Sequence, residues 1–148
     1  MTTPVNDAEP TKEGLAEDAV DRIRSNYVSL LGLVPPSIET RIRVAGFTNR
    51  HQAVEAIEHL RNELILNNSL GRSTGQLVHF GQLVVLGREG PARLHARAAR
   101  NAGATFEELV GVAELALITA GMPAYSLGIE IISELIDEQV PAGHHNSI

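Results

Sequence analysis

The sequence predicts an all-α fold of about six or seven helices, and three observations lead to this prediction. Apolar residues recur at helical spacing through most of the chain, as on the inward face of a helix. No segment alternates apolar and polar residues in the way that a half-buried strand does. Glycine, proline and asparagine fall between the periodic segments, where helices would end.

The length of the chain and the composition of its ends predict the domain organisation. A chain of 148 residues is long enough for one domain with a substantial core. Residues 1–12 include Pro4, Pro10 and several acidic or small polar side chains, which favour a flexible arm. We expect a single helical domain over residues 13–140 and a loose tail over residues 141–148.

Composition argues against several classes of function. The chain has no cysteine, so it has no disulfide, no thiolate metal ligand and no thiol nucleophile. A net charge of −6 and an aromatic content of 3% argue against nucleic-acid partners and anionic membranes. The first residues lack the features of a signal peptide, and no apolar run reaches the ~18 residues of a membrane span. We expect a cytoplasmic protein.

Apolar periodicity predicts three helices in the N-terminal half, over residues 13–31, 37–47 and 49–66. On the third, His51, Glu55 and His59 follow one another at one-turn spacing, which invites a metal reading. The outer two backbones lie about 12 Å apart, whereas a zinc-bound histidine nitrogen sits ~2.1 Å from the ion. One ion cannot bind all three, so we expect a solvated, charge-paired face, and a two-ligand site completed from elsewhere stays open.

The next predicted helix, residues 73–86, carries two rows of side chains. One row is apolar, and Gln76, His79 and Gln82 form the second at i, i+3 and i+6. Solvent faces usually carry lysine or glutamate, and this row has neither. The row fits a pocket lining as well as it fits a solvent face, and all three residues are candidates for substrate binding.

A helix from Pro91 to about residue 102 places His95 on its inward face. Pro91 is expected at the first helical position, where its missing N–H costs nothing. The neighbours of His95 on this face are mostly alanines, while arginines line another face. An imidazole in such surroundings is either a core histidine satisfied by one hydrogen bond or a working acid/base.

Two further helices, residues 106–120 and 123–138, complete the prediction. Thr105 and Glu108 fit a capping box at the start of the first one. Both helices are apolar on more than one face, which is typical of helices buried against another subunit when the chain is this small. We expect a homo-oligomer.

A family resemblance lies mainly in the C-terminal half of the chain. The residues that carry it are Leu70-Gly71-Arg72, Leu77-Val78, Gly87-Arg88-Glu89-Gly90, Leu94-His95, Arg97-Ala98-Ala99, Asn101, Gly103, Thr105, Glu108 and Gly121-Met122-Pro123-Ala124. At these positions the chain resembles the carboxymuconolactone decarboxylase family, which belongs to a wider AhpD-like group of small all-helical proteins. The resemblance implies an AhpD-like helical domain and, because members usually form rings, a trimer or hexamer.

The peroxidase branch of this group uses a Cys-x-x-Cys-x-x-x-His motif together with an upstream glutamate. If His95 is the motif histidine, Arg88 and Pro91 stand at the thiol positions and Gln76 stands at the glutamate position. Neither replacement offers a thiolate, and an amide does not shuttle a proton. The chain therefore lacks the groups for thiol peroxidase activity.

The decarboxylase branch acts on a carboxylated lactone from aromatic-compound catabolism and uses no metal or organic cofactor. The resemblance implies that His95 is a general acid/base, that Glu89 orients it or shares its proton, and that Arg72 holds a carboxylate or lactone oxygen. Arg88 also matches, as a substrate-binding residue or as part of the turn. From pattern alone, Arg72 is as readily a surface arginine, and Glu89 is more readily an acid favoured by the helix N-terminus.

Four positions depart from the decarboxylase pattern. Gly75 replaces a second arginine, Glu130 replaces a histidine, His79 replaces a small hydroxyl residue and Glu114 replaces an apolar one. Fewer cations make a multiply carboxylated lactone a poor fit. We expect a cofactor-free lyase or isomerase that acts on a less charged lactone or keto acid by decarboxylation or related carbon–carbon chemistry.

Two other interpretations stay open. The chain could be a non-catalytic helical oligomer that binds a small molecule or a protein, since packing alone could explain most of the matched residues. Alternatively, His79 and His95 could hold a metal together with a carboxylate.

Overall fold

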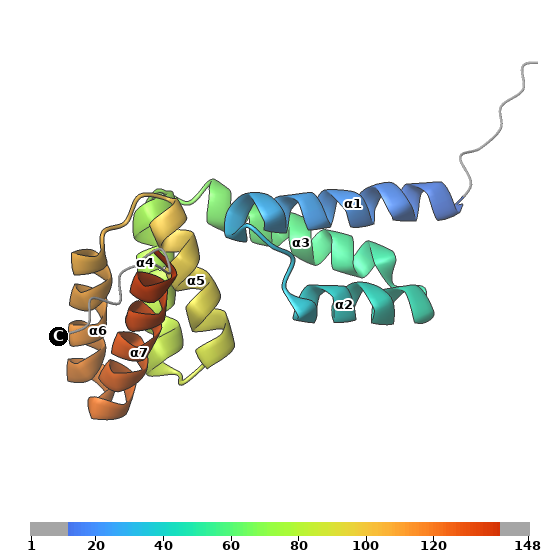
Figure 1. The fold of residues 1–148 in the computed structure, drawn as a ribbon. Helices are drawn as coiled ribbons and strands as arrows, with labels where there is room; N and C mark the ends of the chain where they lie inside the picture. Colours follow the sequence, from blue (N-terminus) through green and yellow to red (C-terminus); the bar gives the residue numbers. More distant parts are fainter. Residues whose placement is uncertain (1–11, 140–148) are drawn as a thin grey trace, which may run out of the picture. The chain divides into compact units, whose positions relative to one another are not determined.

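The computed structural model describes residues 12–139, with side chains from residue 17 onward. This part of the chain is all-helical, as predicted, and contains no strand. Its helices are α1 (Lys12–Leu31), α2 (Pro36–Phe47), α3 (His51–Leu66), α4 (Arg72–Val85), α5 (Glu89–Asn101), α6 (Phe106–Ala120) and α7 (Met122–Gln139) (Figure 1). The predicted arm and tail lie outside the described residues, except that Lys12 already belongs to α1.

The chain forms two compact units, and the boundary between them falls inside α3. The first unit ends at Arg61 and the second begins at Asn62. Each unit is described by itself below. The expectation of a single domain over residues 13–140 stays a prediction.

A buried carboxylate joins the three helices of the first unit. Glu58 of α3 is 3% exposed. Its Oε1 accepts hydrogen bonds from the Tyr27 hydroxyl of α1 at 3.1 Å and from Arg41 Nη1 of α2 at 2.5 Å. Arg61 lies over the Tyr27 ring, 4.5 Å from its centroid, and burial raises the pKa of the Tyr27 hydroxyl. The network compensates the cost of burying the Glu58 charge.

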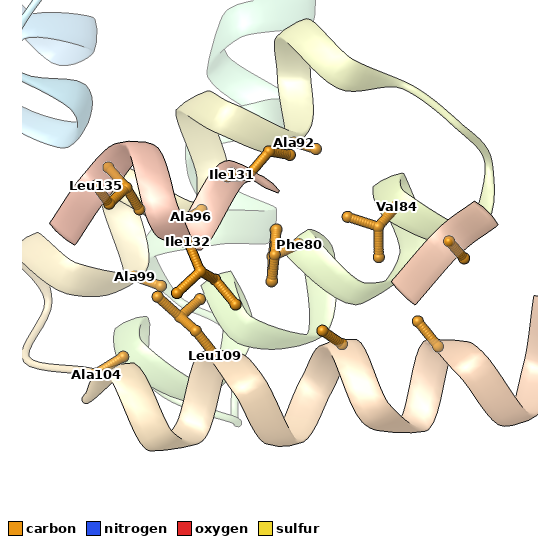
Figure 2. Packing of buried hydrophobic residues seen from close by; sticks show 13 residues of the cluster. Phe80, Val84, Ala92, Ala96, Ala99, Ala104, Leu109, Ile131, Ile132 and Leu135 are labelled. Atoms are coloured by element: carbon orange, nitrogen blue, oxygen red, sulfur yellow. The ribbon is translucent and has the colours of Figure 1, made fainter. Parts of the chain in front are cut away.

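The second unit is organised around α4, which contacts α5, α6 and α7. Small side chains on α5 let it approach α4 closely, because Ala92, Ala96 and Ala99 are completely buried. Figure 2 shows the buried apolar side chains of this unit meeting around Phe80. The core of the second unit is thus built between α4 and its three neighbours, and it leaves one face of α4 for other contacts.

One close contact between helices of this core depends on a glycine. A Cβ atom added at Gly128 of α7 would lie 2.8 Å from the Cβ and 3.6 Å from the Cα of Ala113 in α6. Real Cβ atoms essentially never come as close as 2.8 Å to another heavy atom. Helices α6 and α7 can therefore pack at this distance only because Gly128 has no side chain.

The sequence predicted the start of α6 correctly and the start of α5 incorrectly. The capping box of α6 is confirmed: Glu108 N–H donates to Thr105 Oγ1 at 3.1 Å, and Thr105 N–H donates to Glu108 Oε2 at 2.8 Å. The predicted position of Pro91 was wrong, because α5 begins at Glu89. Pro91 still lies in the first turn, where backbone N–H groups have no partner within the helix, so a missing N–H is tolerated there.

The last two helices keep some apolar side chains exposed. Leu115 and Ile118 of α6 are 70% and 82% exposed, and Met122 of α7 is 57% exposed. Side chains of this kind suit a subunit contact, and the expected homo-oligomer stays a prediction. Among residues 12–139, no helix has both the length and the apolar character needed to cross a membrane.

Candidate functional site

A groove of about 360 Å³ runs along α4 in the second unit. The end of α3, the loop that follows it and one face of α4 form its walls. The lining residues are Leu64, Ile65, Asn68, Leu70, Arg72, Gly75, Gln76, Val78, His79 and Gln82. The row of Gln76, His79 and Gln82 thus faces a concave surface, and their role in binding a substrate stays a prediction.

Behind the groove wall, a hydrogen bond holds the imidazole of His95. His95 of α5 is 7% exposed, and its Nδ1 lies 2.7 Å from Oε1 of Gln76, which is itself 3% exposed. An amide oxygen only accepts hydrogen bonds, so Nδ1 carries the proton and donates it to Gln76. In the neutral ring, Nε2 then keeps its lone pair and can accept a proton.

The second imidazole of the site contacts the first. The ring centroids of His79 and His95 lie 3.9 Å apart, with their planes tilted by 42°. His79 is partly buried and lines the groove, whereas His95 is not one of the lining residues. Two titratable rings from different helices therefore meet at the wall of the groove.

One end of the groove carries a positive charge and open space. Arg72, the first residue of α4, is exposed and contributes the charged side chain among the lining residues. Gly75 stands one turn further along, and a Cβ atom added there would meet nothing within 4 Å. The guanidinium of Arg72 can pair with one carboxylate here. Gly75, at the position expected to hold a second arginine in the decarboxylases, contributes no side chain and leaves open space.

Glu89 pairs with an arginine of its own helix. Its carboxylate, 66% exposed, lies 3.4 Å from Arg93 Nη1 on its own helix. Arg93 binds Glu134 of α7 through two nitrogens at 2.8 and 3.0 Å, and this bonding lowers the pKa of the Glu134 carboxyl. The structure therefore places Glu89 in an ionic cluster between α5 and α7. Gln76 hydrogen-bonds His95, and the catalytic role expected of Glu89 stays a prediction.

Three other residues singled out in the sequence lie away from the groove. Arg88 is the exposed N-cap residue of α5 and is not a lining residue. Glu130 lies 3.3 Å from Arg93, in the same ionic cluster as Glu89. Glu114 is exposed on α6 and does not line the groove. Neither glutamate adds a carboxylate to the groove.

Metal ligation finds little support among residues 12–139. No group of three or more histidine, cysteine, aspartate or glutamate side chains there is arranged to hold an ion. Glu55, from the predicted row on α3, instead accepts a hydrogen bond from Arg22 of α1 at 3.1 Å.

A second hollow lies in the first unit. It has a volume of about 470 Å³, and its lining includes Val44 and Ala45 of α2 and Ala53 and Val54 of α3. Its charged lining residues are arginines, and it brings no histidine or carboxylate together. The groove along α4 is therefore the better candidate for chemistry.

Similarity to known proteins identifies the family of the chain. The sequence pattern of the carboxymuconolactone decarboxylase family matches residues 51–134. The chain belongs to this family. The matched segment contains the whole groove lining as well as His95.

Two similar proteins extend the comparison. An uncharacterized protein of Methanocaldococcus jannaschii is 29% identical over 85 residues, which are 57% of this chain and 79% of the relative. The crystal structure of a Burkholderia xenovorans protein that carries the name carboxymuconolactone decarboxylase matches with a TM-score of 0.64. It covers 84% of this chain and 99% of its own, and at 21% identity it shows the fold alone.

The sequence analysis brought His79 and His95 together only as possible metal ligands, and it did not predict that their rings contact each other. The available signal was that each histidine lies on a face without lysine or glutamate, on consecutive helices that pack together. Which residues of α4 and α5 meet depends on how the two helices are aligned, and periodicity along one helix does not contain that information.

Proposed function

We propose that this member of the carboxymuconolactone decarboxylase family is a cofactor-free lyase or isomerase that acts on a small lactone or keto acid by histidine acid/base chemistry. The observation that carries the proposal is the imidazole of His95, held by Gln76 behind the wall of the α4 groove. A buried imidazole in a fixed tautomer next to a concave surface is suited to transferring protons to and from carbon.

The chemistry follows from the groups that line the groove. Arg72 pairs with the substrate carboxylate and fixes the orientation of the molecule along α4. In a decarboxylation, the bond to the leaving carboxyl carbon breaks, and its electron pair is delocalised into the neighbouring carbonyl as an enolate. The imidazolium form of His95 then provides the proton that restores the carbon–hydrogen bond. In an isomerisation, the same imidazole first removes a proton and then returns it.

The charge of the groove limits the class of substrate that fits it. Arg72 supplies the one fixed positive charge among the lining residues, and Gln76, Gln82 and Asn68 supply neutral amides. A multiply carboxylated lactone would leave carboxylates without a cation, whereas a monocarboxylate matches Arg72 and places its neutral oxygens near the amides. We infer a singly charged substrate of the kind that breakdown of an aromatic compound yields.

The proposal extends to the setting of the enzyme. Because the sequence contains no cysteine, a thiol peroxidase mechanism is not part of it. We infer a cytoplasmic homo-oligomer, a trimer or hexamer, in which exposed apolar side chains such as Leu115 and Ile118 are buried between subunits.

The test is a panel of lactones and keto acids, each with one carboxylate, incubated with the protein in deuterated water. Proton nuclear magnetic resonance follows both substrate loss and deuterium incorporation at carbon. His95→Gln should lower kcat by about 10²–10⁴, and Arg72→Gln should raise KM by about tenfold or more. His59→Gln, an exposed histidine of α3, is the matched control and should leave turnover unchanged.

Two outcomes would overturn the proposal. Turnover that His95→Gln leaves unchanged would remove the imidazole from the chemistry. Binding of panel compounds without any turnover or deuterium incorporation would favour the non-catalytic binding module.

A further inference from the structure

We propose that the hollow between α2 and α3 of one copy of the protein binds the exposed face of α6 of a second copy. The inference rests on the homo-oligomer of the proposed function and deepens it, because it names the two surfaces that meet. Neither surface contributes a lining residue to the groove along α4.

The hollow of the first unit combines apolar side chains with positive charge. Val44 lines it and is 49% exposed, and Phe47, about one turn further along α2, is 94% exposed and extends the apolar surface. The charged lining residues are Arg41 and Arg50, and no acidic residue is among them. This surface therefore favours an apolar partner that carries carboxylates.

The exposed face of α6 has the opposite charge. Leu115 and Ile118 are its exposed apolar residues, and Glu107 and Glu114 are exposed carboxylates on the same side of the helix. The sequence of α6 contains no basic residue. An apolar stripe beside unopposed negative charge is thus available on the second unit.

The two surfaces fit each other in character and in size. Leu115 and Ile118 lie about one turn apart, so both can enter one hollow of about 470 Å³. Burial of these side chains against Val44 would drive association, while the arginines and glutamates would pair around them and fix the orientation. Stable interfaces have this arrangement of an apolar centre with charged groups at its edge.

A second copy is the occupant because every chain carries one surface of each kind. The hollow belongs to the first unit and α6 to the second, so the contact joins two different patches and is head-to-tail. Each bound copy keeps one unused patch of each kind at the two ends of the assembly. Contacts of this type close into a ring when the rotation allows it, which agrees with the trimer proposed above.

The deciding experiment measures the mass of the intact protein by sedimentation velocity and light scattering over a range of concentrations. Val44→Asp and Ile118→Asp each place a charge in one of the two surfaces. Each should raise the dissociation constant of the contact by about 30-fold or more. The matched control is Leu60→Asp, an exposed leucine of α3 outside both surfaces, which should leave the mass unchanged.

Mixing the two variants tests the head-to-tail arrangement. The Ile118→Asp copy keeps an intact hollow, and the Val44→Asp copy keeps an intact α6 face. One good contact can then form, so the mixture should contain dimers, whereas each variant alone should be monomeric. Circular dichroism confirms that both variants fold, and Leu115→Asp replaces Ile118→Asp if the latter does not.

Reversing the charges gives a second test that leaves the apolar residues in place. Arg50→Glu and Glu114→Arg should each raise the dissociation constant by about tenfold, and the chain with both reversals should recover most of the affinity. Losses that simply add in the double variant would show that the two charges do not face each other, and would overturn the inference.

The outcomes separate this contact from the proposed function. An assembly that persists in either Val44→Asp or Ile118→Asp, or a mixture that stays monomeric, would overturn the contact and leave the proposed homo-oligomer in place. A wild-type protein that is monomeric at every concentration would overturn both the contact and the homo-oligomer. The acid/base chemistry is judged independently, by turnover of the lactone and keto acid panel.

Discussion

The packing of α6 against α7 can be tested by giving Gly128 a methyl group. The added Cβ would lie 2.8 Å from the Cβ of Ala113, 3.6 Å from its Cα and 3.9 Å from Cζ of Phe80. The side chain of Ala113 has no rotamer to change, and its Cα belongs to the backbone, so the clash is relieved only if the two helices move apart. Gly128→Ala therefore perturbs the core of the second unit without removing any contact.

The expected magnitude is a balance of two terms. Overpacking a well-packed core costs about 1–3 kcal/mol. Replacing glycine by alanine inside a helix gains up to about 1 kcal/mol. The net effect on Gly128→Ala is a loss of about 1 kcal/mol in the free energy of unfolding of the second unit. The matched control is Gly111→Ala in α6, where an added Cβ meets nothing within 4 Å and only the gain applies.

Urea unfolding followed by far-ultraviolet circular dichroism measures both variants against the wild-type protein. Gly128→Ala should unfold at lower urea and Gly111→Ala at equal or higher urea, with slopes that do not change. If the two variants have the same stability, the close approach of α6 and α7 is not limited by Gly128, and the reasoning fails.

Three further predictions concern single side chains. Glu58→Gln should destabilise the first unit by about 1–3 kcal/mol in thermal or urea unfolding, because Arg41 and Tyr27 lose a buried carboxylate; an unchanged midpoint would show that the network contributes nothing. Glu89→Gln should leave turnover unchanged and alter stability by less than ~1 kcal/mol, since its carboxylate is exposed and pairs with Arg93; a loss of kcat would return it to the site. Thr105→Ala should lower the free energy of unfolding of the second unit by about 1 kcal/mol in urea unfolding, because it removes the side-chain cap of α6. The Thr105→Ser control keeps a hydroxyl and should retain most of this stability, and equal stability of the two variants would contradict the role of the cap.

Local patterns anticipated much of the fold. The apolar period located the helices, and the pair of Thr105 and Glu108 marked the start of α6, because capping depends on residues that are neighbours in the sequence. The inward position of His95 also followed from the period of its own helix. The boundary between the two units could not be predicted in this way. It falls after Arg61, in the middle of α3, where the apolar period of the helix continues without a break.

The site was harder to anticipate than the fold. Glu89 precedes His95 by six residues, which places the two about 120° apart around a helix and on different faces. Glu89 precedes Arg93 by one turn, and this spacing agrees with the pair observed. The partner of His95 came from another helix, at Gln76, and such a contact is fixed by tertiary packing.

The hydrogen bond between His95 and Gln76 is the feature on which the catalytic account depends, and the ring ¹⁵N chemical shifts of His95 test it most directly. At neutral pH, we expect the tautomer with the proton on Nδ1 in the wild-type protein and a mixture of tautomers in Gln76→Leu. A proton on Nε2 in the wild-type protein, or a tautomer that Gln76→Leu leaves unchanged, would contradict the account.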